Sequence, residues 1–327
     1  MTPLKLVFLG SDPIALPLLD WLAGEGKALA RVAAVFTRPD RPAGRGQMIS
    51  ANAIKTWALA HGLPLHQPET LTAEVRDQWA AYAGDVALVM AYGQILREEF
   101  IVTPRLGTLN LHTSLLPKYR GASPIQTAIA NGERETGVSL MRIVRKLDAG
   151  PVADVERTPI ETLDTAGVVE RRLASACVPL LARALPRLRD GSLTFAAQDE
   201  VAATFCRRLG KADGVLDFAQ PASTLAARIN GLFPWPACAV TIGGQSVKLG
   251  LADALGGTGE AGAALGADAH GLLVGTGNGI LRLRQLQRPG GRLLAAADFL
   301  RGFPVPVGTV LASHPMPPLV SAAPFRR

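Results

Sequence analysis

The first half of the chain alternates short, continuously apolar runs with segments of helical periodicity. The apolar runs predict buried strands over 4–9, 31–36, 86–90, 108–112, 138–143 and 152–157. The segments between them predict helices over 13–24, 51–61, 71–82 and 165–188. Strands that are apolar along their length and separated by helices are typical of a parallel sheet covered on both faces. The pattern therefore predicts an α/β fold with a Rossmann-like, mostly parallel sheet.

From Arg207 onward the pattern changes to short segments separated by glycines. After a short helix over 221–232, strands are expected over 238–242, 245–252, 271–277 and 279–287. Several short strands joined by turns predict a small, OB-like β-barrel. We therefore expect four parts, with the last poorly ordered: a domain over 1–190, a linker over 191–206, a β-barrel domain over 207–312 and a tail over 313–327. The low-complexity stretch 256–266 is expected to be an exposed loop.

The charge is distributed unevenly along the 327 residues. Overall the chain carries 34 basic and 27 acidic residues, but residues 207–327 carry 12 basic and 6 acidic ones. A basic second half is typical of proteins that bind a polyanion, although it also serves solubility. No run approaches the roughly 18 apolar residues of a membrane span, and no signal peptide is predicted, so a cytoplasmic protein is expected.

Several common chemistries lack their signatures. The first strand is followed by the single Gly10 instead of GxGxxG, which disfavours dinucleotide binding. Neither GxxxxGKS/T nor GxSxG occurs, so a Walker-type phosphate loop and a nucleophile elbow at Ser114 are not expected. The three cysteines are scattered, with no CxxC pair and no HExxH, so neither a disulfide framework nor a metal is predicted.

The strongest candidate chemistry lies at the end of the strand over 108–112. Asn110 and His112 are two positions apart and so face the same side of that strand, at the edge where open α/β sheets bind ligands. An amide can donate to a developing oxyanion and an imidazole can transfer a proton, which suits acyl-type transfer. A carboxylate such as Asp148 could orient the imidazole or accept a proton from the nucleophile. An Asn-x-His at a strand end is also common as a structural feature, and spacing does not show that Asp148 reaches His112.

Two long segments resemble the folate-dependent formyltransferase family: 110–129 (NLHTSLLPKYRGASPIQTAI) and 136–152 (TGVSLMRIVRKLDAGPV). The loop 35–46 and the segments 233–236, 275–279 and 298–302 extend the resemblance over nearly the whole chain. They are similar to members of the family that formylate an aminoacyl-tRNA. The resemblance implies 10-formyltetrahydrofolate as formyl donor, releasing tetrahydrofolate, and initiator methionyl-tRNA as acceptor. It implies no metal, and we expect a monomer.

The resemblance also implies roles for particular residues. Asn110 would hold the oxyanion, His112 would transfer protons, and Asp148 would orient the site and help to deprotonate the amine. The stretch that contacts tetrahydrofolate would comprise Ser114, Leu115, Leu116 and Pro117. The wall of the pterin pocket would comprise Met90, Tyr92 and Ile95.

Contacts to tRNA are expected from arginines and lysines. By resemblance, the loop with Arg41 and Arg45 enters the acceptor-stem end. In the basic second half the candidates are Arg207, Arg208, Lys211, Arg282, Arg284, Arg288 and Arg292. Alternation over 280–284 places Arg282 and Arg284 on one strand face, which predicts a phosphate rail. Trp235, between two prolines, is expected to be a packing anchor.

The sequence also departs from the family pattern and leaves rival functions open. Ile14 stands where relatives carry an aromatic residue, and Val144, Arg145 and Lys146 stand where they often carry acidic residues and glycine. The rivals are a formyltransferase for an amino-sugar nucleotide, a hydrolase of 10-formyltetrahydrofolate, and a tRNA-binding module without activity. The arginine-rich loop and the basic second half argue against the sugar nucleotide. The intact Asn110, His112 and Asp148 argue against the inactive module.

Overall fold

The computed structural model describes residues 2–43 and 48–325, and its contacts divide the chain into two compact units. The first unit comprises the chain up to Arg120 together with Gly137–Thr158 and Arg171–Ala203. The second comprises Gly121–Thr136, Pro159–Glu170 and the chain from Thr204 onward. Each unit is therefore assembled from segments that are far apart in the sequence.

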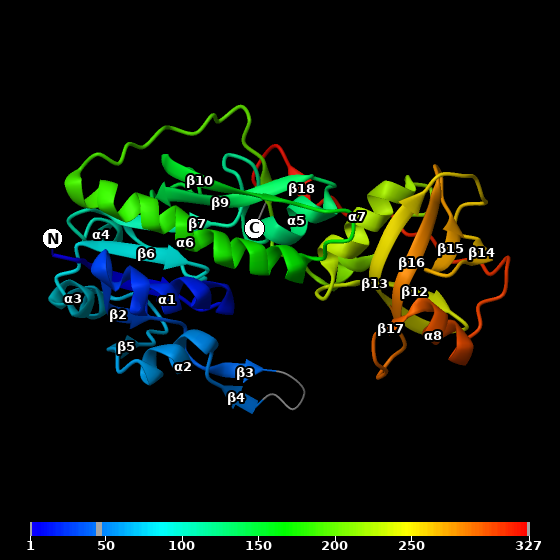
Figure 1. The fold of residues 1–327 in the computed structure, drawn as a ribbon, viewed down its shortest axis with the longest axis horizontal. Coiled ribbons are helices and arrows are strands. Elements are labelled where there is room, and N and C mark those ends of the chain that lie inside the picture. Colours follow the sequence, from blue (N-terminus) through cyan, green and yellow to red (C-terminus); the bar gives the residue numbers. More distant parts are fainter. Residues whose placement is uncertain (1, 44–47, 326–327) are drawn as a thin grey trace. The chain divides into compact units, whose positions relative to one another are not determined.

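A seven-stranded sheet forms the centre of the first unit, with the strand order β10-β9-β7-β6-β1-β2-β5 (Figure 1). Its strands are β1 (Leu4–Gly10), β2 (Ala30–Phe36), β5 (Leu65–His66), β6 (Val86–Met90), β7 (Thr108–His112), β9 (Glu135–Arg142) and β10 (Val152–Pro159). The neighbours from β7 through β5 are parallel, and β9 runs antiparallel to β7. The expected α/β fold with a mostly parallel sheet is confirmed.

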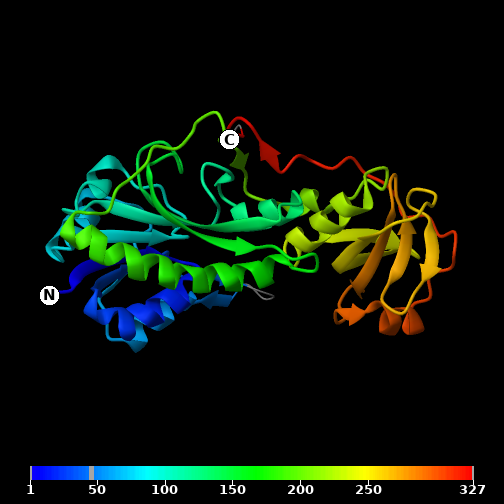
Figure 2. The same ribbon diagram turned by 45° about the horizontal axis from the view of Figure 1, so that its top comes forward.

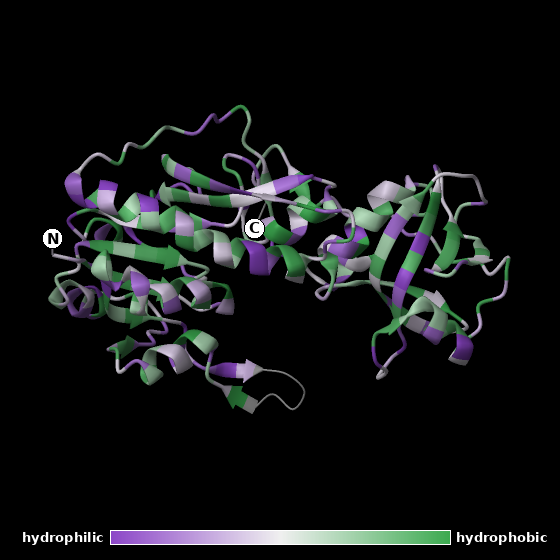
Figure 3. Cartoon of the chain, viewed as in Figure 1, coloured by the Kyte–Doolittle hydropathy of each residue, from purple (hydrophilic) through white to green (hydrophobic). Residues whose placement is uncertain are grey.

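Side-chain burial explains why the predicted strands form. All five residues of β6 are buried, and the strand is hydrophobic along its length in Figure 3. On one face of the sheet, side chains of β1 and β6 share a core cluster with Trp79 of α3 (Ala73–Ala81) and Phe100 of α4 (Glu98–Ile101). The helices and 3-10 turns of this unit are η1 (Pro13–Ala15), α1 (Leu16–Ala23), η2 (Glu25–Ala28), α2 (Ala53–Ala60), α3 (Ala73–Ala81), α4 (Glu98–Ile101) and most of α6 (Ala166–Asp190). Within the described part of the chain, no helix has both the length and the apolar character that crossing a bilayer requires.

The second unit is built on an antiparallel half-barrel, as the sequence predicts for the C-terminal part. The strand order is β12-β13-β16-β15-β14, with β17 beside β16. These strands are β12 (Cys238–Ile242), β13 (Gln245–Leu255), β14 (Ala264–Ala267), β15 (Leu272–Gly275), β16 (Ile280–Gln287) and β17 (Leu294–Ala295). The unit also holds α5 (Pro124–Ala130), η3 (Lys211–Gly214), α7 (Ala222–Leu232) and α8 (Ala296–Gly302).

Helices α5 and α7 of the second unit pack closely at a glycine. A Cβ atom at Gly231 would lie 2.4 Å from the backbone nitrogen of Ala130. The missing side chain therefore lets the two backbones approach each other. The remainder of α7 packs on β13 and β16, with Leu225 and Ile229 fully buried in the core of the unit.

The prediction of a poorly ordered tail is wrong. Strand β18 (Val320–Ser321) pairs antiparallel with β11 (Phe205–Cys206), and Figure 2 shows the two short strands side by side. Leu319 is buried, and the carbonyl of Pro318 accepts a hydrogen bond from Arg207. The composition of the tail suggested disorder, but its backbone groups find partners in the second unit.

The stretch 256–266 is also more ordered than its composition predicts. Ala263 and Ala264 are buried, and β14 begins at Ala264 and pairs with β15. Small side chains lower the sequence complexity of this stretch without preventing it from packing. Only its first part is a loop outside the sheet.

Candidate active site

Asn110 and His112 lie at the carboxyl end of β7, beside the parallel strand β6. Asn110 is half-buried, and its carboxamide makes no hydrogen bond with any residue that the structure describes. His112 is 7% exposed. The strand thus presents one amide donor and one imidazole at the edge of the sheet where ligands of open α/β folds bind.

A backbone carbonyl fixes the orientation of the His112 ring. Nε2 lies 3.0 Å from the carbonyl oxygen of Tyr119, which can only accept a hydrogen bond. We therefore assign the Nε2–H to this bond, which leaves Nδ1 without a hydrogen in the neutral ring. Nδ1 faces the carboxylate of Asp148, with 3.9 Å between Nδ1 and Oδ2. This distance is too long for a direct hydrogen bond between the two side chains.

Asp148 lies in the connection between β9 and β10, in a loop with an unusual backbone. Its φ of +49° is in the left-handed region, which non-glycine residues rarely adopt. Two residues later the loop comes so close to β9 that a Cβ at Gly150 would lie 1.9 Å from the carbonyl oxygen of Arg142. The structure thus brings Asp148 to His112, which spacing in the sequence did not show.

The proposed folate-contacting stretch is held by serine hydroxyls. Ser114 is fully buried, and its Oγ donates to the carbonyl of Lys118 at 2.7 Å. Ser139 of β9 donates to the carbonyl of Ser114 and accepts from the backbone nitrogen of Leu116. The amide of Leu116 and the carbonyl of Leu115, which accepts from Lys118, are therefore bonded within the protein, and the backbone of this half-buried stretch is fixed.

The residues proposed for the pterin pocket differ in exposure. Met90 is fully buried and Ile95 is 64% exposed. The ring of Tyr92 lies in the core cluster of α3 and α4, while its carbonyl accepts from the Oγ of Ser11. The tyrosine side chain is therefore part of the core, and any contact to a ligand would come from the backbone.

Of the basic residues expected to bind phosphate, some are exposed and others are paired with a buried carboxylate. Arg41 of β3 (Arg41–Ala43), which pairs with β4 (Met48–Ser50), has a 59% exposed side chain 3.8 Å from Glu69. Arg45 lies outside the described residues. Arg208 and Lys211 are exposed. Arg207 instead binds the buried carboxylate of Asp213, and this pairing makes it a structural residue.

The arginines of the phosphate rail expected on β16 lie beside carboxylates. Arg282 and Arg284 share one face of the strand, and Figure 3 shows the alternation of polar and apolar positions. However, Asp253 of the neighbouring β13 accepts from both guanidinium groups, and Asp268 also binds Arg282. The two charges are therefore largely neutralised by carboxylates within the unit.

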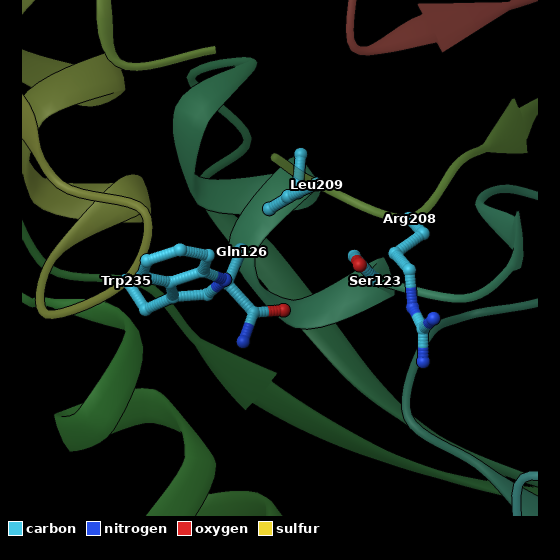
Figure 4. Close-up of a pocket in the computed structure, with 5 residues that line it drawn as sticks. All are labelled: Ser123, Gln126, Arg208, Leu209 and Trp235. Carbon is cyan, nitrogen blue, oxygen red and sulfur yellow. The ribbon is translucent and has the colours of Figure 1, made fainter. Parts of the chain in front are cut away.

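Arg208 and Trp235 line a pocket of the second unit together with Ser123, Gln126 and Leu209 (Figure 4). Trp235 is 56% exposed, so the expectation that it is a packing anchor is wrong. The pocket combines a flat aromatic surface with a guanidinium, a carboxamide and a hydroxyl. These groups suit a nucleobase and its phosphate.

No motif in the sequence marks three residues that lie beside the loop of Asp148. Arg120 is fully buried and binds Gln198 and Glu200 of the segment expected to be a plain linker. Hydrogen bonds from Arg120 and Lys146 lower the pKa of Glu200 to about 2, so its carboxylate stays ionised at neutral pH. Only the position of Arg120 within the resembling segment 110–129 could have drawn attention to it. Within the described ranges, no group of three or more His, Cys, Asp or Glu side chains could hold a metal.

The sequence of this chain matches a known protein family and several named proteins. A family described as formyl transferase matches residues 4–185, and its C-terminal domain matches residues 208–304. The methionyl-tRNA formyltransferase of Aromatoleum aromaticum is 41% identical over 94% of this chain and 96% of its own length. The chain belongs to the methionyl-tRNA formyltransferase family. The enzyme of the same name from Pseudomonas entomophila is also 41% identical, over 90% of this chain and 94% of its own.

Solved structures share the fold of this family at low identity. An N-formyltransferase from Helicobacter canadensis, solved with folinic acid and dTDP-3-aminofucose, has a TM-score of 0.63 and 17% identity. The similarity covers 86% of this chain and 99% of that one. HypX from Aquifex aeolicus in complex with tetrahydrofolic acid has a TM-score of 0.61 and 16% identity, over 96% of this chain and 51% of its own. The family is folate-dependent, and these complexes illustrate folates bound on the same fold.

The substitution Tyr92→Phe tests the placement of this side chain in the core. Burial raises the pKa of Tyr92 to about 12, and its hydroxyl has no partner among the described residues. The raised pKa of Tyr92 therefore contributes to the free energy of unfolding of the wild type. This contribution is fully present below the unfolded pKa of about 10 and is lost as the pH rises through 12. In denaturant unfolding, we expect the variant to be at least as stable as the wild type at pH 7 and more stable than the wild type above pH 10. In a titration, its affinity for folate should equal that of the wild type.

The matched control is Tyr82→Phe, because the hydroxyl of Tyr82 bonds Nε2 of His66 at 2.7 Å. This variant should be destabilised at pH 7 by the loss of that bond. A loss of folate affinity in Tyr92→Phe would instead assign the buried hydroxyl to the donor site.

Proposed function

We propose that the chain transfers the formyl group of 10-formyltetrahydrofolate to the α-amino group of initiator methionyl-tRNA, as a monomer in the cytoplasm. The product would be the formylated initiator tRNA used to begin translation. The observation that carries the proposal is the convergence of an unbonded amide, an oriented imidazole and a carboxylate at one sheet edge. Relatives about 40% identical over nearly the whole chain carry the same activity in their names.

Asp148 supplies the base that the acceptor needs. The pKa of an α-amino group is about 7.7–8.0, so at neutral pH a large share is protonated and cannot attack. The Asp148 carboxylate, 13% exposed, takes this proton directly or through water. The amine nitrogen then forms a bond to the formyl carbon, and the carbonyl electron pair moves to oxygen.

Asn110 and His112 stabilise the oxyanion that this attack creates. The Asn110 amide donates to it, and a protonated His112 adds a positive charge through Nδ1–H while Nε2–H stays bonded to Tyr119. When the intermediate collapses, the bond between the formyl carbon and the folate nitrogen breaks. The attacking nitrogen loses its second proton at this stage, and the departing folate nitrogen takes up that proton. The first proton, held by Asp148, is released to water.

Contacts to the donor would come from the backbone of the stretches around Leu116 and Met90. Leu115, Leu116 and Pro117 follow directly on the catalytic strand, and the turn after β6 contains Ala91 and Gly93, both with positive φ. A pterin is flat, partly apolar and edged with donors and acceptors. Backbone groups at an apolar sheet edge match such a ring.

Contacts to tRNA would come from the exposed basic residues of both units. In the first unit these are Arg41 and, from sequence alone, Arg45. In the second they are Arg208 and Lys211, and Trp235 offers a stacking surface in the same pocket as Arg208. Arg207, Arg282 and Arg284 are paired with carboxylates of the same unit, so we do not assign them phosphate contacts.

An amino-sugar nucleotide is the alternative acceptor, because the H. canadensis relative was solved with one. At 17% identity that similarity concerns the fold alone. An exposed indole and guanidinium in the second unit, and 12 basic against 6 acidic residues after Cys206, favour the larger polyanion.

Formyl transfer from 10-formyltetrahydrofolate to methionine-charged initiator tRNA is the direct test. We expect fast formylation of initiator tRNA, slow formylation of methionine-charged elongator tRNA, and none of free methionine. Formate release without formylated tRNA would indicate a hydrolase. No product with either tRNA, together with transfer to an amino-sugar nucleotide, would establish the alternative acceptor.

His112→Ala should reduce kcat by about 10²- to 10⁴-fold, the usual contribution of positioned proton transfer. Because His112 is buried at the sheet edge, tRNA affinity measured by filter binding should change little. A rate close to that of the wild type would remove His112 from the mechanism. A loss of tRNA affinity equal to the loss of rate would place it in acceptor binding instead.

Arg208→Ala should raise the KM for tRNA without changing the KM for the donor. The slope of log affinity against log salt concentration should become shallower by about 1, the change expected for the loss of one phosphate contact. Trp235→Ala should also raise the KM for tRNA but leave the salt slope unchanged, because stacking releases no counterion. The control is Arg301→Ala, an exposed arginine of the same unit that removes the same charge. Equal effects of Arg208→Ala and Arg301→Ala would contradict a specific role for the pocket.

A further inference from the structure

The segment between the two matched family domains contacts the catalytic loop. Gln198 lies outside both 4–185 and 208–304. Its Nε2 donates to the carbonyl oxygen of Asp148 at 2.8 Å and to that of Gly150 at 2.7 Å. One carboxamide therefore binds the carbonyl of the residue that carries the catalytic carboxylate and the carbonyl of the glycine two positions later.

A buried guanidinium fixes the direction of that carboxamide. Arg120 is fully buried, and its Nε and Nη2 donate to Oε1 of Gln198 at 3.0 and 2.8 Å. Turning the amide over would place its NH₂ against the guanidinium donors and its oxygen against two carbonyls. The NH₂ group must therefore face the catalytic loop.

Glu200 completes the support of Arg120. It accepts from Nη1 at 3.1 Å and from Nη2 at 2.9 Å, and Lys146 donates to it at 2.5 Å. Lys146 belongs to the loop that carries Asp148. The segment from Gln198 to Glu200 thus holds that loop at its start and at its end.

This support is needed because two residues of the site have backbone conformations that non-glycine residues rarely adopt. Asp148 has a φ of +49°, and Tyr119, whose carbonyl binds His112, has a φ of +59°. Arg120 directly follows Tyr119. The contacts of Arg120 and Gln198 therefore reach both the residue that holds the imidazole and the loop that presents the carboxylate.

We propose that Gln198, oriented by Arg120, is a positioning residue that holds Asp148 at its distance from His112, so that the segment joining the two family domains is part of the active site. The expected change in kcat rests on the proposed function, whereas the positioning of the loop does not. Gln198 touches neither substrate nor the reacting atoms. It acts through the backbone of Asp148 and Gly150.

The variant that tests this is Gln198→Glu in the full chain, measured by kinetics. Glutamate keeps the acceptor for Arg120 but replaces the NH₂ donor with an oxygen that repels the two loop carbonyls. We expect kcat to fall by about 10- to 100-fold, because a displacement near 1 Å of a catalytic group can have an effect of this size. Both KM values and the melting temperature should stay unchanged. The control Ala197→Ser, at the exposed neighbouring position, should behave as wild type.

Hydrogen exchange gives a second measurement that does not depend on the acceptor. In Gln198→Glu, amides of the loop 144–151 should exchange faster, while those of the core strand β6 should not change. If the wild type fails to formylate tRNA, the proposed function fails while this measurement still tests the inference. Wild-type kcat and unchanged loop exchange would overturn the inference. A parallel fall of kcat, both KM values and melting temperature would also overturn it, because it would show general support of the fold.

Discussion

A guanidinium with no exposure to solvent is the constraint on which the architecture of the catalytic unit depends. Leaving the charge of Arg120 unpaired inside the protein would be very costly, so carboxylate and amide acceptors have to be brought to it. The chain provides them from residues 198–200, about eighty positions later. Meeting this requirement draws residues 198–200 to the catalytic loop, within the part of the connecting segment that belongs to the first unit.

At the edge of the sheet, the polar groups that hold the loop are separate from an amide that the fold leaves unbonded. The Oγ atoms of Ser114 and Ser139 are bonded to backbone carbonyls and hold the loop, whereas the Asn110 amide has no bond to any described residue. The second unit repeats this division. Asp253 occupies the guanidinium groups of β16, whereas Arg208 is exposed in a pocket. Structure and function thus draw on different members of the same residue types.

Local patterns in the sequence were enough to predict much of this molecule. Continuous apolar runs predicted the strands of the parallel sheet, and a spacing of two placed Asn110 and His112 on one side of a strand. Such rules fail where a partner comes from a distant part of the chain. The reach of Asp148, the pairing of Arg282 with Asp253 and the support from Gln198 all depend on which strands and loops become neighbours. Composition also misled at the tail, since backbone pairing of β18 with β11 needs no apolar run.

The contacts of Gln198 also bear on how genes for such proteins can be cut and joined. A catalytic fragment ending at residue 190, where the sequence pattern suggests a boundary, would lack Gln198 and Glu200, the acceptors that the connecting segment brings to the buried Arg120. A chimera that exchanged C-terminal domains at that point would import a foreign segment beside its own Asp148. The last segment of the first unit ends at Ala203. Recombination between relatives should therefore preserve residues 191–203 together with the N-terminal part.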